Sequence, residues 1–224
     1  MDVPEQDKGL AARLREATAA EHKDTESRSF ISQLMGGELS LDAYTIYLAQ
    51  YAYVYRALES RAPQPGDPAI LSDPALPRFA SIVSDLEHLG ATDWERSHPA
   101  LKATQAYVDH LESIEDSDVP RYLAHHYTRY LGDLSGGQAI AKLVARHYGA
   151  SDDQLAFYRF ELISSAARYK RSYREQVDSL GFADEQEQTL FAEAKLAFGL
   201  NGEMFSELGE TESGRSVGTT TPGA

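Results

Sequence analysis

The chain has 224 residues, a formal net charge of −14 and no cysteine. Its length is sufficient to bury a sizeable core, and its acidity argues against nucleic acid as a partner. The absence of cysteine excludes disulfides, thiolate nucleophiles and thiolate-ligated metal sites.

The N-terminal segment MDVPEQDKGLAARLREAT contains no apolar stretch of the kind that a secretory signal needs. No run of the sequence approaches the roughly 18 apolar residues of a membrane-spanning helix, so we expect a cytoplasmic protein that does not contact membranes.

The first predicted helix carries an apolar stripe, Leu10, Leu14 and Ala17, that leads to His22. A single helical histidine is more often a surface or core residue than a ligand, so His22 alone does not indicate a site.

Helical periodicity continues through the next part of the chain. Ser40 is typical of the N-cap of a long helix, in which apolar residues recur at three- and four-residue steps. The clearest break follows at residues 61–77, which contain five prolines. The helical pattern resumes at Phe79, and we find neither a strand pattern nor an internal repeat. We therefore predict an all-α protein with a single domain over residues 1–208.

A further helix is predicted to begin after Asp118 and to run to about His147, through the sequence RYLGDLSGGQAIAKL of residues 129–143. Three glycines interrupt its apolar stripe: Gly132, Gly136 and Gly137. Each interior glycine costs a helix about 0.5–1 kcal/mol relative to alanine. Because the stripe resumes after Gln138 without a polar linker, one kinked helix is favoured over two helices joined by a loop. Glycines on one face would let a large, flat ligand approach the backbone.

Asp133 lies within this segment between leucines, and we identify no ion-pair partner three or four residues away. A partly buried carboxylate at this position would have a disturbed pKa, which is typical of functional groups. The sequence contains no HExxH motif, and the pattern of its histidines argues against a zinc or di-iron centre. The adjacent His125 and His126 point about 100° apart on a helix. The others after His22 are interpreted as solvated surface residues: His88, His98, His110 and His147.

One region in the second half of the chain is locally basic. Residues 121–174 carry nine Arg and Lys against four Asp and Glu, a local net charge of +5. The cluster Arg168, Lys170, Arg171 and Arg174 is either a solvated helix face or a clamp for a carboxylate or phosphate. A final helix is predicted to end near Leu208. Residues 209–224 have no apolar stretch and are predicted to be disordered.

Three segments together resemble the haem oxygenase family, in the family's order and spacing. HHYTRYLGDLSGGQAIAKLVARHYG, residues 125–149, resembles the distal-helix signature. REATAAEHKDTES, residues 15–27, resembles the proximal helix, and FYRFELISSAARYKRSYREQVDSL, residues 157–180, resembles a later haem-contacting helix. The resemblance covers nearly all of residues 10–208. It implies a single-domain helical fold with haem sandwiched between a proximal helix and a kinked, glycine-rich distal helix.

The resemblance also implies roles for single residues. His22 would be the axial ligand of the haem iron, with Thr18 and Glu26 as its helix neighbours and Glu26 orienting it. Asp133 would organise a distal water network, with Arg129 and Tyr127 as network or haem-edge residues. The distal helix would lie over the haem at Gly132, Gly136 and Gly137. The positions that meet the propionates are Arg15, Tyr127, Lys170 and Arg174; many relatives have lysine at the place of Arg15.

The activity that the resemblance implies is cleavage of haem to biliverdin, with release of CO and ferrous iron. Haem b would be both substrate and prosthetic group, and O2 the oxidant. The chain has no nucleotide-binding glycine motif, so electrons would come from an external donor. We expect a ferredoxin with its reductase, or a flavoprotein reductase, to dock on the basic region of a monomer. The physiological purpose, iron acquisition or bilin supply, stays open.

Two other classes of protein are compatible with parts of this pattern. A haem-binding carrier or sensor that leaves its ligand intact would need His22 and the basic clamps, but neither Asp133 nor the glycines. A purely structural helical protein would leave the three costly glycines unexplained.

Overall fold

The computed structural model describes the backbone of residues 8–218, and the side chains of the same range except Glu26 and residues 213–218. This part of the chain is all-helical and contains no strand, as predicted. Its α-helices are α1 (Leu10–Ala17), α2 (Ala19–Glu26), α3 (Ser29–Gly36), α4 (Leu41–Glu59), α5 (Phe79–His88), α6 (Trp94–Ser97), α7 (Lys102–Ser113), α8 (Val119–Gly132), α9 (Gln138–Tyr148), α10 (Ala166–Asp178) and α11 (Asp184–Gly218). Short helical turns connect them: η2 (Ala69–Ser72), η3 (Asp133–Gly137), η4 (Asp152–Gln154) and η5 (Ala156–Tyr158).

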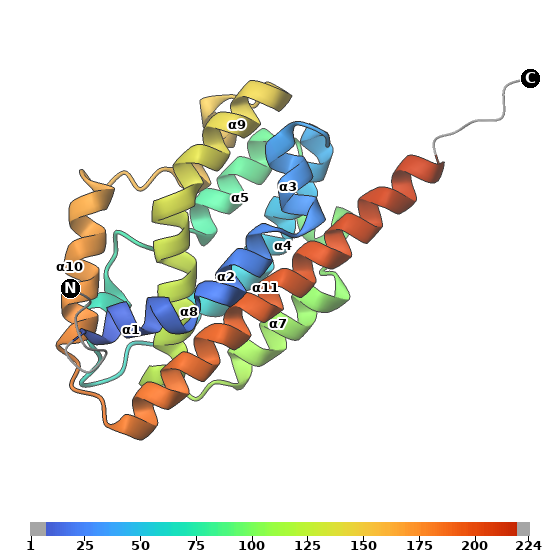
Figure 1. Ribbon diagram of the computed structural model, residues 1–224. Helices are drawn as coiled ribbons and strands as arrows, with labels where there is room; N and C mark the ends of the chain where they lie inside the picture. The colour runs from blue at the N-terminus through green and yellow to red at the C-terminus, as the bar shows by residue number, and fades with distance from the viewer. Residues whose placement is uncertain (1–7, 219–224) are drawn as a thin grey trace, which may run out of the picture.

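The core is organised around two long helices, α4 and α11. Ser40 caps α4 by accepting the backbone N–H of Ala43, and most of the following helix is buried. Its tyrosines fill the core with large rings, among them Tyr44, Tyr51 and Tyr55, all fully buried. Helix α11 crosses the molecule diagonally in Figure 1, with α2 and α7 on either side and α8 packed against it. Because α8 and α2 both pack on α11, residues far apart in the sequence are held at fixed positions relative to each other.

The glycine-rich segment forms one continuous helical path, which confirms the preference for a single kinked helix. Helix α8 passes into the π-helical turn η3 and then into α9 without leaving the helical region. Gly132 and Gly137 have right-handed helical dihedrals, so neither glycine is needed for its conformational freedom. The role of these two glycines therefore lies in the absence of a side chain, which leaves space next to the helix backbone. A π-helical turn inside a helix is frequently found at a functional site.

Two helix boundaries differ from the sequence prediction. The first predicted helix is divided at Thr18, whose hydroxyl donates to the carbonyl of Leu14 at 2.9 Å. Helix α11 does not end near Leu208 but continues to Gly218. The extension packs on α3: Leu208 and Gly209 are buried, and a β carbon at Gly209 would lie 3.2 Å from Oγ of Ser29. The predicted disorder of residues 219–224 lies outside the described residues.

Candidate functional site

Helix α2 carries His22 on an exposed surface. The imidazole stands edge-on to the ring of Phe198 on α11, with 5.4 Å between the ring centroids. The turn before it is fixed by Thr18, which is buried and whose carbonyl accepts the backbone N–H of His22 at 3.0 Å. At the other end, the hydroxyl of Thr25 donates to the carbonyl of Phe198 at 3.1 Å. These contacts hold α2 on α11 and leave the imidazole side of the helix accessible. The predicted role of Glu26 falls on a side chain outside the described residues.

The three glycines of the distal segment have two different surroundings. Gly132 and Gly136 are exposed, and a β carbon added to either would meet no described atom within 4 Å. Gly137 is buried, and a β carbon there would lie 2.8 Å from Cδ1 of Tyr158. Two of the glycines therefore present bare backbone to open space, as a flat ligand requires. The third makes room for a protein side chain, and its haem contact stays a prediction.

Asp133 is buried at the start of the π-helical turn, with 7% of its surface exposed. The hydroxyl of Tyr55 donates to its Oδ2 atom. Nη2 of Arg129 lies 3.6 Å from its Oδ1 atom, so the expectation that Asp133 has no ion-pair partner in its own helix is wrong. Arg129 is four residues earlier, on the same side of the helix. Burial raises the pKa of Asp133 above its ordinary value, and the charge of Arg129 opposes this effect.

Arg129 connects Asp133 to α4 and α11. Its Nη1 atom donates to Oδ1 of Asn201 at 2.6 Å, and its Nη2 atom donates to the hydroxyl of Tyr51 at 3.2 Å. The guanidinium also lies over the ring of Tyr51, 4.6 Å from its centroid. A guanidinium keeps its charge in such a setting, because its pKa is far above neutral. The result is a buried cation and a buried carboxylate held together by Tyr51, Tyr55 and Asn201.

Sequence reasoning missed Tyr51, Tyr55 and Asn201 as site residues. The two tyrosines are four residues apart on α4 and were part of its apolar stripe, so nothing distinguished their hydroxyls from those of the other tyrosines. Asn201 is on α11, 72 residues from Arg129, its partner. Only the packing of α4, α8 and α11 brings these groups together.

The four residues predicted to bind propionates come together from α1, α8 and α10. Burial raises the pKa of the Tyr127 phenol, while the neighbouring Arg174 and then Arg15 lower it. Nζ of Lys170 donates to Oγ of Ser135 at 2.9 Å, which ties α10 to the π-helical turn. Partial burial, and then the charge of Arg174, lowers the pKa of Lys170. The basic cluster is thus divided: Lys170 and Arg174 are half-buried, whereas Arg168 and Arg171 are exposed.

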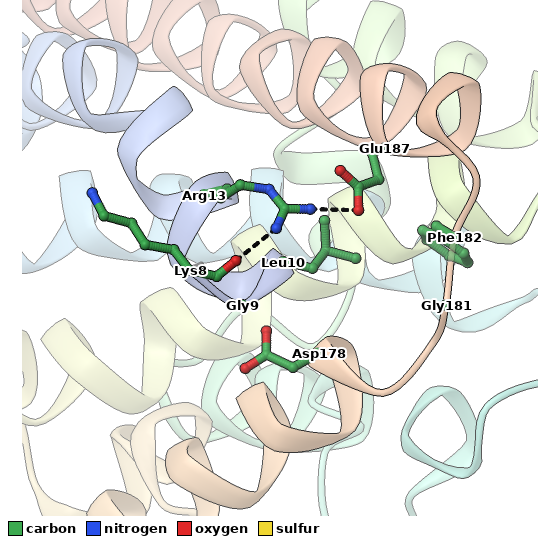
Figure 2. A pocket seen from close by; sticks show the side chains of 8 residues that line it. All are labelled: Lys8, Gly9, Leu10, Arg13, Asp178, Gly181, Phe182 and Glu187. Carbon is green, nitrogen blue, oxygen red and sulfur yellow. Dashed lines mark hydrogen bonds and ion pairs between the residues drawn. The ribbon is translucent and has the colours of Figure 1, made fainter. Parts of the chain in front are cut away.

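A pocket of about 290 Å³ lies between the N-terminus of α1, the end of α10 and the start of α11 (Figure 2). Arg13 occupies it, donating to Glu187 and to the carbonyl of Lys8. Asp178 accepts the backbone N–H of Ala11 at 2.8 Å and so holds the first turn of α1. Because Arg13 pairs with Glu187 and Asp178 holds the first turn, these contacts anchor α1, and with it Arg15.

Comparison with known proteins relates these features to a family. The family model described as "Heme oxygenase" matches residues 8–207. A "Heme oxygenase" of Porphyra purpurea is 36% identical over 89% of this chain and 86% of its own length. "Heme oxygenase 1" of Homo sapiens is 32% identical over 94% of this chain and 76% of its own length.

Solved structures agree with the sequence relatives. A heme oxygenase from Leptospira interrogans has a TM-score of 0.82 at 36% identity, over 89% of this chain and 100% of that one. Heme oxygenase-1 from the cyanobacterium Synechocystis, crystallised in complex with heme, has a TM-score of 0.85 at 32% identity. This match covers 94% of the chain and 96% of the cyanobacterial one.

Proposed function

The chain belongs to the heme oxygenase family, whose activity is haem cleavage, and we propose that it uses for this activity the residues between α2 and the α8–η3–α9 segment. The protein is a haem-degrading oxygenase; haem is its substrate and prosthetic group, and an external reductant drives the reaction. Biliverdin, CO and iron are the products that characterise the family. The assignment of single residues below is our proposal.

His22 is the proposed ligand of the haem iron. Its imidazole is exposed on α2, and a neutral imidazole is a suitable ligand for iron in a chain without cysteine. Gly132 and Gly136 would face the opposite side of the macrocycle, because their backbone borders open space. Arg15, Tyr127, Lys170 and Arg174 would bind the two propionates, since guanidinium and ammonium groups pair with carboxylates. When bound, haem supplies the iron that activates O2 and the ring that is opened.

Asp133 is the proposed proton-handling group. Its carboxylate is fixed by the hydroxyl of Tyr55 and by Arg129, so its free lone pairs have a constant direction. Burial raises its pKa, which brings a carboxyl group nearer to the range in which it exchanges protons at neutral pH. We infer that Asp133 holds a proton at a carboxylate oxygen and passes it on through water. Between these events the positive charge of Arg129 favours the ionised carboxylate.

The buried Asp133–Arg129–Tyr55 network next to two open glycines is the observation that supports oxygenase over carrier. A protein that only stores haem would not need a buried ion pair beside the ligand, because burying an ion pair is costly in desolvation energy.

The use of O2, an external ferredoxin or flavoprotein reductase, a monomeric state and a cytoplasmic location remain predictions. None of the helices described here is long and apolar enough to span a membrane. The exposed Arg168 and Arg171 support docking of an acidic redox partner on α10.

One experiment separates the classes of protein. Hemin is added to the full chain, the Soret band is recorded, and reductant and O2 are then supplied. An oxygenase loses the Soret band while bilin absorption grows. A Soret band that persists under reductant and O2 indicates a carrier, and absence of a histidine-ligated band indicates a structural protein.

A second experiment tests the docking surface on α10. Arg171→Glu is expected to slow reduction of the haem complex by the partner protein but not by a small reductant. Equal reduction rates of wild type and Arg171→Glu by the partner protein would contradict docking at this surface.

A further inference from the structure

Two histidines and a carboxylate gather in a second cluster outside the proposed haem site. His110 comes from α7, His125 from α8 and Glu193 from α11. Nε2 of His125 lies 2.9 Å from Oε1 of Glu193, and Nε2 of His110 contacts the same oxygen. The three candidate ligand atoms all lie within 4.8 Å of one another. His110 is half-buried in this cluster, so its interpretation as a solvated surface residue is wrong.

The burial of the cluster is graded from the core to the surface. The side chain of His125 is completely buried, that of Glu193 is 7% exposed and that of His110 is 23% exposed. His125 and Glu193 are therefore fixed by the core, and an ion from solvent would reach the cluster past His110. Nε of Arg121 lies 3.9 Å from the other oxygen of Glu193, and its own side chain is half exposed. A buried carboxylate that is shared by two imidazoles is a favourable place for a cation.

The donor set is suitable for a divalent transition-metal ion. Two imidazole nitrogens and one carboxylate oxygen are zinc ligands, and three protein ligands leave a fourth position open. Zinc–ligand bonds of about 2.0–2.1 Å place tetrahedral ligand atoms roughly 3.3 Å apart, so small side-chain movements would admit the ion. His125 also has a hydrogen-bond partner on its other nitrogen, because the hydroxyl of Tyr107 lies 3.3 Å from Nδ1. Such a partner is typical of histidines that bind metals.

We propose that His110, His125 and Glu193 form a binding site for a divalent transition-metal ion of the zinc class, with its open position on the side of His110. Bound metal would connect α7, α8 and α11. It would also change the hydrogen bond to Tyr107. Without metal, Nε2 of His125 donates to Glu193 and Nδ1 accepts from Tyr107; with metal on Nε2, Nδ1 carries the hydrogen and donates. Because Arg129 interacts with Tyr107, metal occupancy would reverse one hydrogen bond in a chain that leads to Asp133.

Zinc titration of the haem-loaded full chain tests this proposal, since His22 is then engaged by haem. We expect one Zn²⁺ per chain by isothermal titration calorimetry. Because His110→Ala and Glu193→Gln each remove a ligand, they should weaken binding by more than the roughly 10–100-fold that loss of an outer-shell partner costs. The matched control is His88→Ala, an exposed histidine outside the cluster, which is expected to bind Zn²⁺ as the wild type does. Equal affinities for wild type and His110→Ala, or no stoichiometric binding by the wild type, would overturn the proposal.

A second measurement does not depend on the folding of a variant. X-ray absorption at the zinc edge of the wild-type complex is expected to show two imidazoles and one carboxylate in the first coordination shell. A shell without imidazole scattering would place the ion elsewhere and contradict the site.

Thermal unfolding of the folded variants adds a third measurement. Excess Zn²⁺ is expected to raise the unfolding midpoint of the wild type and of His88→Ala, but not of Glu193→Gln.

Discussion

The two helical segments proposed to enclose haem are built in opposite ways. Of the described side chains of α2, Thr25 alone is buried, and His22 stands exposed on its surface. In α8 most side chains are buried, from Tyr122 to Leu131. The following Asp133 accepts a hydrogen bond from Tyr55 on α4, and its ion-pair partner Arg129 donates to Asn201 on α11. On the proximal side, α2 thus presents one exposed candidate ligand, His22. On the distal side, Asp133 belongs to a buried network of hydrogen bonds between α8, α4 and α11. Substitutions should therefore act locally on the proximal side and be coupled on the distal side.

The largest effect is expected from His22→Ala. Loss of the iron ligand should remove the histidine-ligated Soret band and with it haem degradation. Because the side chain is exposed, the free energy of unfolding of the haem-free protein should change by less than about 0.5 kcal/mol. Absorption spectroscopy and urea unfolding measure the two quantities, and added imidazole is expected to restore ligation. An unchanged Soret band in His22→Ala would contradict the assignment.

Tyr55→Phe tests the coupling on the distal side. It removes the hydroxyl that donates to Asp133, a bond worth about 0.5–1.5 kcal/mol, so biliverdin formation should slow by up to about tenfold. A double-mutant cycle with Asp133→Asn measures whether the two groups act together. Coupled positions give a double variant that is scarcely slower than Asp133→Asn alone. Independent, additive losses would show that the tyrosine serves packing only.

Two glycine substitutions provide a matched pair within the distal segment. Gly137→Ala should destabilise the haem-free protein by about 1–3 kcal/mol, because its β carbon meets the ring of Tyr158. Gly136→Ala meets no described atom and should be neutral or stabilising by up to about 1 kcal/mol, yet weaken haem binding. Urea unfolding and hemin titration of both variants separate the roles. Equal destabilisation by the two substitutions would remove the distinction between the glycines.

The free energy of unfolding is expected to depend on pH through Asp85, which holds a turn next to the distal segment. Asp85 accepts the backbone N–H groups of Ala156 and Phe157, and so holds the turn whose Tyr158 packs on Gly137. Burial raises the pKa of Asp85 from 3.8 to about 6. The folded state therefore keeps this proton longer than the unfolded state. The contribution to stability is complete below about pH 4 and declines by about 3 kcal/mol as the pH rises through 6.

The control for this dependence is Asp85→Asn, which cannot ionise. The difference in unfolding free energy between wild type and variant should shift against the wild type between pH 4 and pH 7, as measured by urea unfolding. A difference that is constant over this range would show that Asp85 is ionised normally.

The helices and the glycine kink could be predicted from the sequence because they follow from local periodicity. The ion pair between Arg129 and Asp133 was also within reach, since the two residues are four apart on one helix. In contrast, Tyr55 and Asn201 join Asp133 and Arg129 only through tertiary packing. The different surroundings of Gly136 and Gly137 depend on where Tyr158 lies, which no local pattern shows. The same reason hid the His110 cluster, whose members come from three helices.

In the proposed mechanism Asp133, fixed by its buried partners, directs oxygen chemistry on haem ligated by His22. The decisive experiment is single-turnover conversion of the haem-loaded Asp133→Ala variant with reductant and O2. We predict a Soret band like that of the wild type and a biliverdin rate lower by roughly 100-fold, the contribution typical of a general acid. Biliverdin formation at the full wild-type rate would contradict the claim.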